Sequence, residues 1–222
     1  MTGIDIVSYD ERDHLAGACR TYADAFHASY WPMIDEADPA LVRDVLRGMT
    51  MFSNDTVVAL DGGEVVGILV GYTGFAARRV AAAGTVLLAR VVPGLLLGRY
   101  HASPRARRFL LDVARDLTVF ELFGRPRVDP CCEVLLFAVR GSAQGRGIGR
   151  RLMDEFVRRA RGAGAKLVLV TTDTTLAWQF YPAYGFERVR SAPLEYCYRE
   201  ALPGVEARAF RYALNLSREV DR

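Results

Sequence analysis

The sequence lacks several features that would place it in a class at once. No stretch of about 18 apolar residues occurs, so no membrane-spanning helix is expected and no membrane partner is predicted. The N-terminus shows no basic segment followed by an apolar run, and a secretory signal peptide is therefore not predicted. The four cysteines have neither CxxC nor Cys/His ligand spacing, which argues against a metal site and for free thiols in a reducing compartment. Cytoplasmic localisation is the default expectation.

The sequence also lacks a large excess of charge of either sign. The formal net charge of +3 is too small to argue for a nucleic-acid partner. Lysine is nearly missing: Lys166 is the only one, so the Gly-Lys-Ser/Thr of a Walker phosphate loop does not occur. The remaining composition is that of an ordinary globular protein, with 51% hydrophobic and 25% charged residues in a chain of 222. We therefore expect one domain over residues 1–222.

What the sequence does contain is a strand, a glycine-rich turn and a helix within residues 132–161. Residues 134–139 form an unbroken apolar run, which is typical of a strand covered on both faces. The turn at residues 144–149 follows, and its glycines allow backbone N–H groups to approach a phosphate closely. The helix after the turn is expected to bury one stripe of apolar side chains. That stripe consists of Ile148, Leu152, Met153, Phe156, Val157 and Ala160.

The start of this helix suits a pyrophosphate. Free N–H groups, the positive end of the helix dipole and two nearby arginines all favour an anion. The intervals between Gly145, Gly147 and Gly149 do not fit the GxGxxG dinucleotide fingerprint. The plainer alternative is a tight β–α turn that leads into a helix with a basic, solvated face.

This turn resembles the signature of the GCN5-related N-acetyltransferases (the GNAT superfamily), which reads Gln/Arg-x-x-Gly-x-Gly/Ala. Gln144, Gly147 and Gly149 match its fixed positions, and residues 177–186 resemble the family's second motif, Ala-x-x-Phe-Tyr-x-x-x-Gly-Phe. Two motifs in the right order are far more specific than either alone. The resemblance implies a GNAT-like α+β fold, a mixed central sheet flanked by helices, with acetyl-CoA as co-substrate and no metal.

The elements predicted from periodicity follow the order in which that family begins, namely a strand, two helices and a hairpin. The predicted strands cover residues 4–9, 56–60, 64–72, 134–139, 166–172, 187–190 and 207–216. The predicted helices outside the insertion cover residues 10–29, 39–52, 148–161 and 175–184. Asp10 and Pro39 are expected at the starts of the first two helices.

The main departure from the family is a helical insertion at residues 76–130, between the third and fourth strands. A helix over 76–92 is expected to end at Pro93-Gly94, and Ser103-Pro104 marks the start of another. The apolar residues of the insertion could pack on the domain, form a homodimer interface or line an acceptor pocket. These three alternatives stay open.

The resemblance also assigns the chemistry. Glu133 lies eleven residues before Gln144, the interval at which histone-acetylating members carry their general base. Glu133 is therefore expected to take a proton from the acceptor amine, directly or through a water. The alternative is a structural salt bridge of Glu133 with Arg127 or Arg140.

The same resemblance implies the groups that hold the coenzyme. The backbone of Phe137, Ala138 and Val139 would bind the pantetheine arm and polarise the thioester carbonyl, and Gly141-Ser142 is compatible with a bulge and bend there. Thr174 stands where the family usually has an asparagine that bonds the pantetheine. The pyrophosphate would be held by the residues of the turn. These are Gln144, Gly145, Arg146, Gly147, Ile148, Gly149 and Arg150.

Tyr181 matches the family's tyrosine that protonates the departing thiolate. Leu176, Phe180 and Ala183 fall on one helical face and are expected to pack on the sheet, with Tyr181 pointing away from them. Tyr184 is the alternative acid.

Two loops supply candidate contacts for the acceptor, although an aromatic plug or a solvated loop is the plainer interpretation. Their residues are His27, Tyr30, Trp31, Asp35, Glu195, Tyr196, Tyr198 and Glu200. The sequence thus predicts an acetyl-CoA-dependent N-acetyltransferase for a primary amine of a small molecule or peptide. The alternatives are a non-catalytic acyl-CoA-binding regulatory module, or a transferase for longer acyl chains or hydroxyl acceptors.

Overall fold

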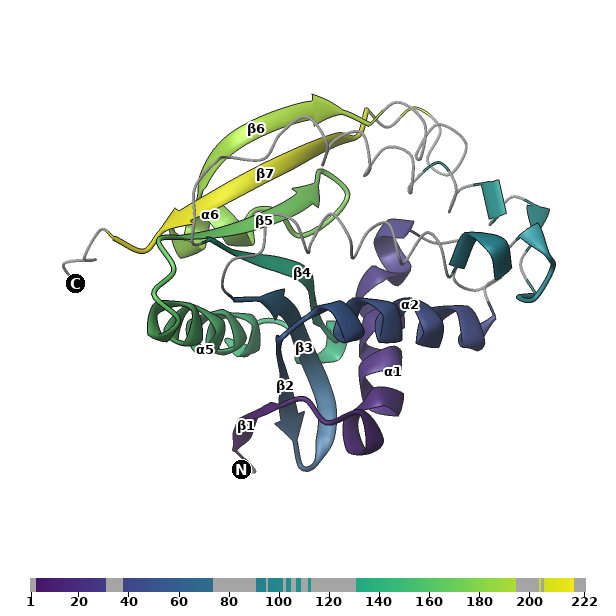
Figure 1. Cartoon of the computed structure of the whole chain (residues 1–222), viewed down its shortest axis with the longest axis horizontal. Coiled ribbons are helices and arrows are strands. Elements are labelled where there is room, and N and C mark those ends of the chain that lie inside the picture. Colours follow the sequence, from purple (N-terminus) through teal and green to yellow (C-terminus); the bar gives the residue numbers. More distant parts are fainter. Residues whose placement is uncertain are drawn as a thin grey trace.

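A seven-stranded mixed sheet forms the centre of the molecule in a computed structural model (Figure 1). The structure describes residues 3–30, 38–73, 91–94, 96–101, 103–104, 107–108, 112, 131–194, 204 and 206–217. Within these residues the strand order is β1-β2-β3-β4-β5-β7-β6, and every neighbouring pair is antiparallel except β4–β5. The strands are β1 (Ile4–Ser8), β2 (Asp55–Asp61), β3 (Glu64–Tyr72), β4 (Cys131–Val139), β5 (Leu167–Asp173), β6 (Glu187–Pro193) and β7 (Arg208–Asn215). The predicted α+β class is confirmed.

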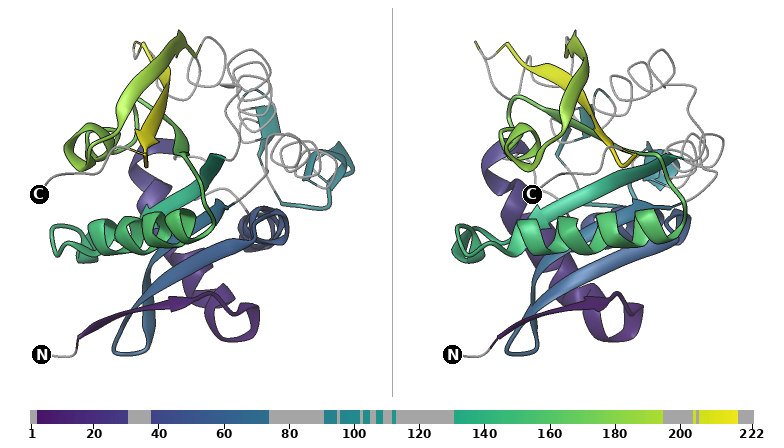
Figure 2. Two further views of the ribbon diagram at one scale, coloured as in Figure 1. Left: turned by 60° about the vertical axis from the view of Figure 1, so that its left-hand side comes forward. Right: turned by 90° about the vertical axis from the view of Figure 1, so that its left-hand side faces the viewer.

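Helices cover both faces of this sheet. One face carries α1 (Glu11–Tyr30) and α2 (Pro39–Phe52), and the other carries α5 (Ile148–Gly162) and the short α6 (Phe180–Tyr184), as Figures 1 and 2 show. Among the described residues, one large apolar core lies between the sheet and α5–α6, and another lies between the sheet and α1–α2. The sheet is strongly twisted, so that β6 and β7 lie at one end of the molecule and β1 and β2 at the other (Figure 2).

The predicted helix starts are confirmed. Asp10 Oδ1 accepts the backbone N–H of Arg12 at 2.8 Å, and Asp38 Oδ1 accepts that of Ala40 at 2.8 Å. Pro39 occupies the first helical position, where its missing N–H costs no hydrogen bond. These caps fix where α1 and α2 begin.

The apolar stripe predicted for the central helix is the buried face of α5. All six of its side chains are buried, and they are the only buried residues of this helix. Each large apolar side chain buried in this way contributes about 1.5–3 kcal/mol to stability. This packing holds the N-terminus of α5 against the end of β4, where the candidate site lies.

The expected helix end at Pro93-Gly94 is wrong. Both residues have helical backbone, and the turn comes at Leu97 and Gly98. The N–H of Leu97 donates to Pro93 O at 2.9 Å, because a proline lacks only the donor and its carbonyl can still accept. The predicted start at Ser103 is confirmed, since the N–H of Arg107 donates to Ser103 O at 3.0 Å. Residues 76–90 of the predicted helix lie outside the described part of the chain.

The helix predicted over residues 175–184 is shorter than expected and consists only of α6. Asp173 Oδ1 accepts both the backbone N–H and the hydroxyl of Thr175, which builds a local turn at the end of β5. Such side-chain bonds compete with helical ones, so the chain becomes helical only at Phe180.

Candidate active site

The strands β4 and β5 pair over only the first part of their length. Their parallel register ends at the pair Val134–Val170, although β4 continues to Val139 and β5 to Asp173. β5 stays paired with β7 along its full length, and the two parallel strands diverge (Figure 1). Among the described residues, residues 135–139 of β4 therefore have no strand partner on the β5 side. Backbone groups that face this side are placed to bind an extended ligand.

A β-bulge lies where this pairing ends. Leu136 is opposite Val70 of β3 and Val134 is opposite Gly71, so Leu135 is an extra residue in β4. A bulge bends its strand and increases the local twist, which turns the end of β4 away from β5. The sequence pattern suggested a bulge at residues 141–142 instead, but these residues belong to the 3₁₀ turn η1 (Gly141–Ala143). The predicted departure of β4 from β5 is thus real, and its origin lies further upstream.

The backbone of Phe137 and Val139 faces the β5 side. The N–H of Arg140 donates to Val66 O of β3 at 2.9 Å, which fixes the direction of the backbone there. Backbone groups alternate along an antiparallel strand, so those of Ala138 also face β3. The N–H groups of Phe137 and Val139 are therefore the two that can contact a ligand beside β4, and Ala138 contributes only its position between them.

The turn before α5 presents N–H groups to solvent. Gly145 and Gly147 both have φ of +76°, a region that glycine reaches without strain. Gly147 is the N-cap of α5, and neither a side-chain cap nor an acidic residue occupies the first helical turn. The first N–H groups of a helix lack intrahelical partners, and the dipole makes this end positive. This geometry is that of an anion site.

Gly149 brings the anion site and the strand end together. A Cβ there would lie 3.3 Å from Phe137 Cζ, a tight contact, and 3.6 Å from Phe180 Cε2, so glycine gives the closest approach without displacing the Phe137 ring. The Phe137 and Phe180 rings contact each other edge to face at 5.2 Å. The end of β4, the start of α5 and α6 therefore meet at one point.

The side chains of the turn have different partners. Gln144 Nε2 donates to Val139 O at 3.1 Å, which ties the turn to the end of β4. Arg146 Nη1 pairs with Asp61 Oδ2 of β2 at 2.7 Å, so the side chain of Arg146 is directed toward the β2–β3 hairpin. Ile148 is buried and offers only its backbone. Of these side chains, only Arg150 stays in the first turn of α5 without an ion pair among the described residues.

Glu133 is a buried carboxylate, with 7% of its surface exposed. It lies opposite Tyr72 of β3 and beside Leu169 of β5. Since Cys132 and Val134 pack in the core on the α5 side, Glu133 faces the opposite side of the sheet.

The expected alternative for Glu133, a salt bridge with Arg140, is not formed. Arg140 Nη1 lies 3.0 Å from Glu64 Oε1, and its Nη2 donates to Val65 O at 2.9 Å. Arg127, the other proposed partner, lies outside the described residues.

Tyr181 is the buried residue of α6, and the expected packing face of this helix is wrong. Ala183 is exposed, whereas the ring of Tyr181 lies 5.6 Å from those of Phe186 and Tyr212. Aromatic residues of β7 and of the chain after α6 pack against the Tyr181 ring. In a helix this short, these tertiary contacts decide which side chain is buried, and the helical period does not. Burial raises the pKa of Tyr181 above its ordinary value.

Two other predicted residues also have defined partners. The hydroxyl oxygen of Thr174 accepts the N–H of Arg208 at 3.0 Å, which joins the end of β5 to the start of β7. The hydroxyl of Tyr184 donates to Asp154 Oδ1 of α5 at 2.7 Å, and the guanidinium of Arg150 lies 5.4 Å from the centre of the Tyr184 ring.

Sequence reasoning missed two polar residues near this region. Arg211 of β7 is buried and donates through Nη2 to Thr171 Oγ1 at 3.3 Å, on the same side of the sheet as Glu133. Asp24 of α1 accepts the N–H of Gly141 at 2.6 Å, at the bend that leads into the turn. Arg211 is the one charged residue in the otherwise apolar run 209–213, and this was the available signal. Nothing local connects Asp24 to a residue so far along the chain.

The predicted acceptor contacts cannot be placed. The side chains at His27 and Tyr30, and residues 31–37 and 195–200 entirely, lie outside the described part of the chain. In the part that is described, no helix is both long and apolar enough to cross a membrane. The same part contains no cluster of three or more His, Cys, Asp or Glu side chains arranged to hold a metal ion.

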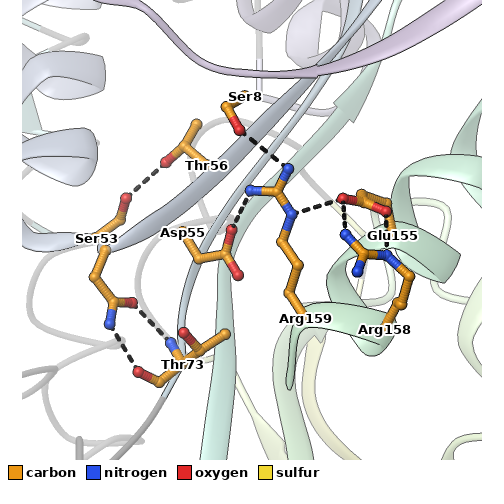
Figure 3. A network of polar contacts seen from close by, with 9 residues as sticks. Ser8, Ser53, Asp55, Thr56, Thr73, Glu155, Arg158 and Arg159 are labelled. Atoms are coloured by element: carbon orange, nitrogen blue, oxygen red, sulfur yellow. Dashed lines mark hydrogen bonds and ion pairs between the residues drawn. The ribbon is translucent and has the colours of Figure 1, made fainter. Parts of the chain in front are cut away.

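A polar network fixes the far end of α5 (Figure 3). Arg159 donates to Asp55 Oδ1 of β2 at 2.9 Å, to Glu155 Oε1 at 2.7 Å and to Ser8 Oγ at 3.1 Å. Burial raises the pKa of Asp55, while hydrogen bonds from Arg158 and then Arg159 lower the pKa of Glu155 to about 2. The network joins α5 to β1 and β2 and so holds the helix whose other end forms the anion site.

Comparisons with known proteins agree with the fold. A family model described as an acetyltransferase (GNAT) domain matches residues 113–188. An agmatine N-acetyltransferase has 18% sequence identity and a TM-score of 0.59, with 96% of this chain and 99% of that chain covered. The ribosomal-protein-S18-alanine N-acetyltransferase from Escherichia coli has 12% sequence identity and a TM-score of 0.54, with 99% of this chain and 98% of that chain covered. YncA from Salmonella typhimurium, solved with its cofactor acetyl-CoA, has 14% sequence identity and a TM-score of 0.56, with 99% of this chain and 98% of that chain covered. No curated protein matches the sequence.

Proposed function

We propose, from the premise that this chain has the GNAT fold and matches the GNAT acetyltransferase domain, that it is an acetyl-CoA-dependent N-acetyltransferase for a primary amine. One observation carries the proposal: the pairing of β4 with β5 ends at Val134–Val170, and the uncapped start of α5 lies beside the strand end so released. The first feature suits an extended thioester arm, and the second suits its pyrophosphate. The acceptor is an amine of a small molecule or peptide.

The coenzyme is held chiefly by backbone groups. The N–H groups from Gly145 to Arg150 bind the pyrophosphate, and Gln144 keeps the turn against the strand through Val139 O. The N–H groups of Phe137 and Val139 bind the pantetheine arm in the manner of a missing strand. The hydroxyl of Thr174 accepts from Arg208, and its hydrogen is left to donate to the arm.

The transfer requires a neutral amine and a polarised thioester. Glu133 takes a proton from the ammonium, and the nitrogen lone pair then attacks the thioester carbonyl carbon. A backbone N–H near Val139 stabilises the oxyanion that forms. When the tetrahedral intermediate collapses, the C–S bond breaks, the new C–N bond remains, and the thiolate takes a proton from a neighbouring acid. The acylated nitrogen loses its second proton to solvent, which leaves the neutral amide.

Tyr181 is the acid in this proposal. Its raised pKa keeps the phenol protonated until a thiolate is present beside it. Tyr184 is less suited, because its hydroxyl proton is already donated to the Asp154 carboxylate. The products are an N-acetyl amide and free coenzyme A.

The test is a screen of amines with the purified chain and acetyl-CoA, in which release of free thiol and formation of the amide are both measured. Agmatine and a peptide with N-terminal alanine are sensible first acceptors, because acetyltransferases of the same fold are named for them. Turnover with any primary amine supports the proposal. Binding of acetyl-CoA without thiol release across the panel would indicate a regulatory module, and turnover only with longer acyl-CoA or with alcohols would indicate the other alternative.

A further inference from the structure

Arg150 is set apart from the other arginines around α5 by its partner. Arg146, Arg158 and Arg159 each form an ion pair with a carboxylate, whereas Arg150, like Arg151 and Arg161, has none among the described residues. Its guanidinium instead lies 5.4 Å from the centre of the Tyr184 ring. An aromatic face holds a guanidinium in place without neutralising its charge. Arg150 therefore remains able to pair with an anion.

Tyr184 is itself fixed from two sides. Its hydroxyl donates to Asp154 Oδ1 at 2.7 Å, and its ring stacks on Phe180 at 5.7 Å. Asp154 lies four residues after Arg150, so both project from one face of α5. The bond from Tyr184 of α6 to Asp154 of α5 thus orients the Tyr184 ring beside the guanidinium of Arg150, which lies in the first turn of α5.

We propose that Tyr184 and Asp154 are positioning residues that hold Arg150 as the side-chain ligand of the coenzyme phosphates. The inference rests on the proposed function, because it requires the phosphate-bearing coenzyme at the start of α5. It assigns Tyr184 to binding and leaves proton transfer to Tyr181. A direct ion pair between Arg150 and Asp154 would neutralise the guanidinium, and the structure has none: Asp154 Oδ1 accepts from the Tyr184 hydroxyl, and the guanidinium lies by the Tyr184 ring.

The experiment compares two thioesters, acetyl-CoA and S-acetylpantetheine, which lacks every phosphate. For Tyr184→Phe and Asp154→Asn we expect KM for acetyl-CoA to rise about three- to tenfold while kcat is unchanged, as for a loss of ground-state binding. Arg150→Met is expected to raise KM at least as much. With S-acetylpantetheine, kcat/KM should be the same for all three variants and the unaltered chain. Arg12→Met, which removes an exposed arginine from the start of α1, is the control and should change neither substrate's kinetics.

Coupling between the residues gives the decisive readout. In an Arg150→Met background, Tyr184→Phe should raise KM no further, since the residue that it positions is gone. An equal further rise would overturn the proposal, and so would a fall in kcat with both thioesters, which would place Tyr184 in the chemistry. An unaltered chain that turns over neither thioester would instead refute the proposed function. Thermal unfolding of each variant separates these outcomes from misfolding, and Asp154→Asn repeats the test without altering an aromatic ring.

Discussion

Single residues carry the chemistry in this account, and the two that matter most are buried. Glu133 and Tyr181 lie on opposite sides of the sheet, each near the point where β4 leaves β5. Both were selected through the family resemblance, Glu133 by its interval to the glycine turn and Tyr181 by its place in the second motif, and their roles stay predictions. An acceptor amine at Glu133 and a thioester beside β4 would then bring the two proton transfers to opposite sides of one carbonyl.

Glu133→Gln should lower kcat/KM by about 10²–10⁴-fold, the usual effect of losing a general base. The loss should be greatest at low pH, because the variant depends on amine that has already lost its proton in solution. A pH–rate profile from about pH 6 to 9 measures this. Glu206→Gln, which alters an exposed carboxylate, is the control, and an unchanged profile in Glu133→Gln would remove this residue from the mechanism.

Tyr181→Phe should lower kcat about 10²-fold while the unfolding midpoint hardly changes. Phenylalanine keeps the ring contacts with Phe186 and Tyr212, so the variant removes only the proton donor. Steady-state kinetics with acetyl-CoA and thermal unfolding are measured on the same preparation. Full turnover would exclude Tyr181 as the acid.

Among the helices, strands and turns, features set by local sequence pattern were predictable, and features set by contacts between distant residues were not. The strand, the glycine turn and the stripe of α5 were predictable, because each follows from periodicity or from backbone freedom within a few residues. The bulge at Leu135 was not, since it depends on how β3 pairs with β4. The length of α6 was missed because Asp173 builds a local turn there, and the Asp24–Gly141 bond joins residues that are distant in sequence.

Gly147→Ala should weaken coenzyme binding and destabilise the fold by about 1–2 kcal/mol. A Cβ at this position would meet no atom within 4 Å, so the effect comes from the φ of +76° alone. Gly162→Ala is the matched control, since it also lies in open space on α5 but has an ordinary φ. Calorimetric titration with coenzyme A and urea unfolding measure the two effects. Equal behaviour of the two variants would contradict the role given to the turn.

At the scale of the whole molecule, the sheet has two parts that share only a short parallel seam. The β1–β4 part carries α1 and α2, while β5–β7 carries α6, and the seam covers residues 131–134 and 167–170. The packing of α5 and the Arg159 network hold the first part to the helix of the anion site.

In the insertion, Tyr100 donates to Asp44 of α2 at 2.9 Å, which supports a packing role there, whereas Leu96 and Leu97 are exposed. The sequence could not distinguish these roles, because apolar residues suit all of them.

The Arg159 network predicts how stability depends on pH. The pKa of Glu155 is lowered in the fold to about 2, so its contribution is present above the unfolded pKa and is lost as pH falls toward 2. The pKa of Asp55 is raised, which acts in the opposite direction. We expect the free energy of unfolding to fall less between pH 5 and pH 3 in Glu155→Gln than in the unaltered chain, as urea unfolding would measure. Equal slopes would contradict the role of this carboxylate.

The proposed function requires that main-chain groups at the end of β4 and the start of α5 form one coenzyme site. Calorimetric titration of the intact chain with acetyl-CoA, together with its thermal unfolding, tests it most directly. We expect saturable heat with one site per chain, and a stabilisation of about 2.7 kcal/mol when the ligand is at a hundred times its Kd. No heat and no thermal protection at saturating acetyl-CoA would contradict it.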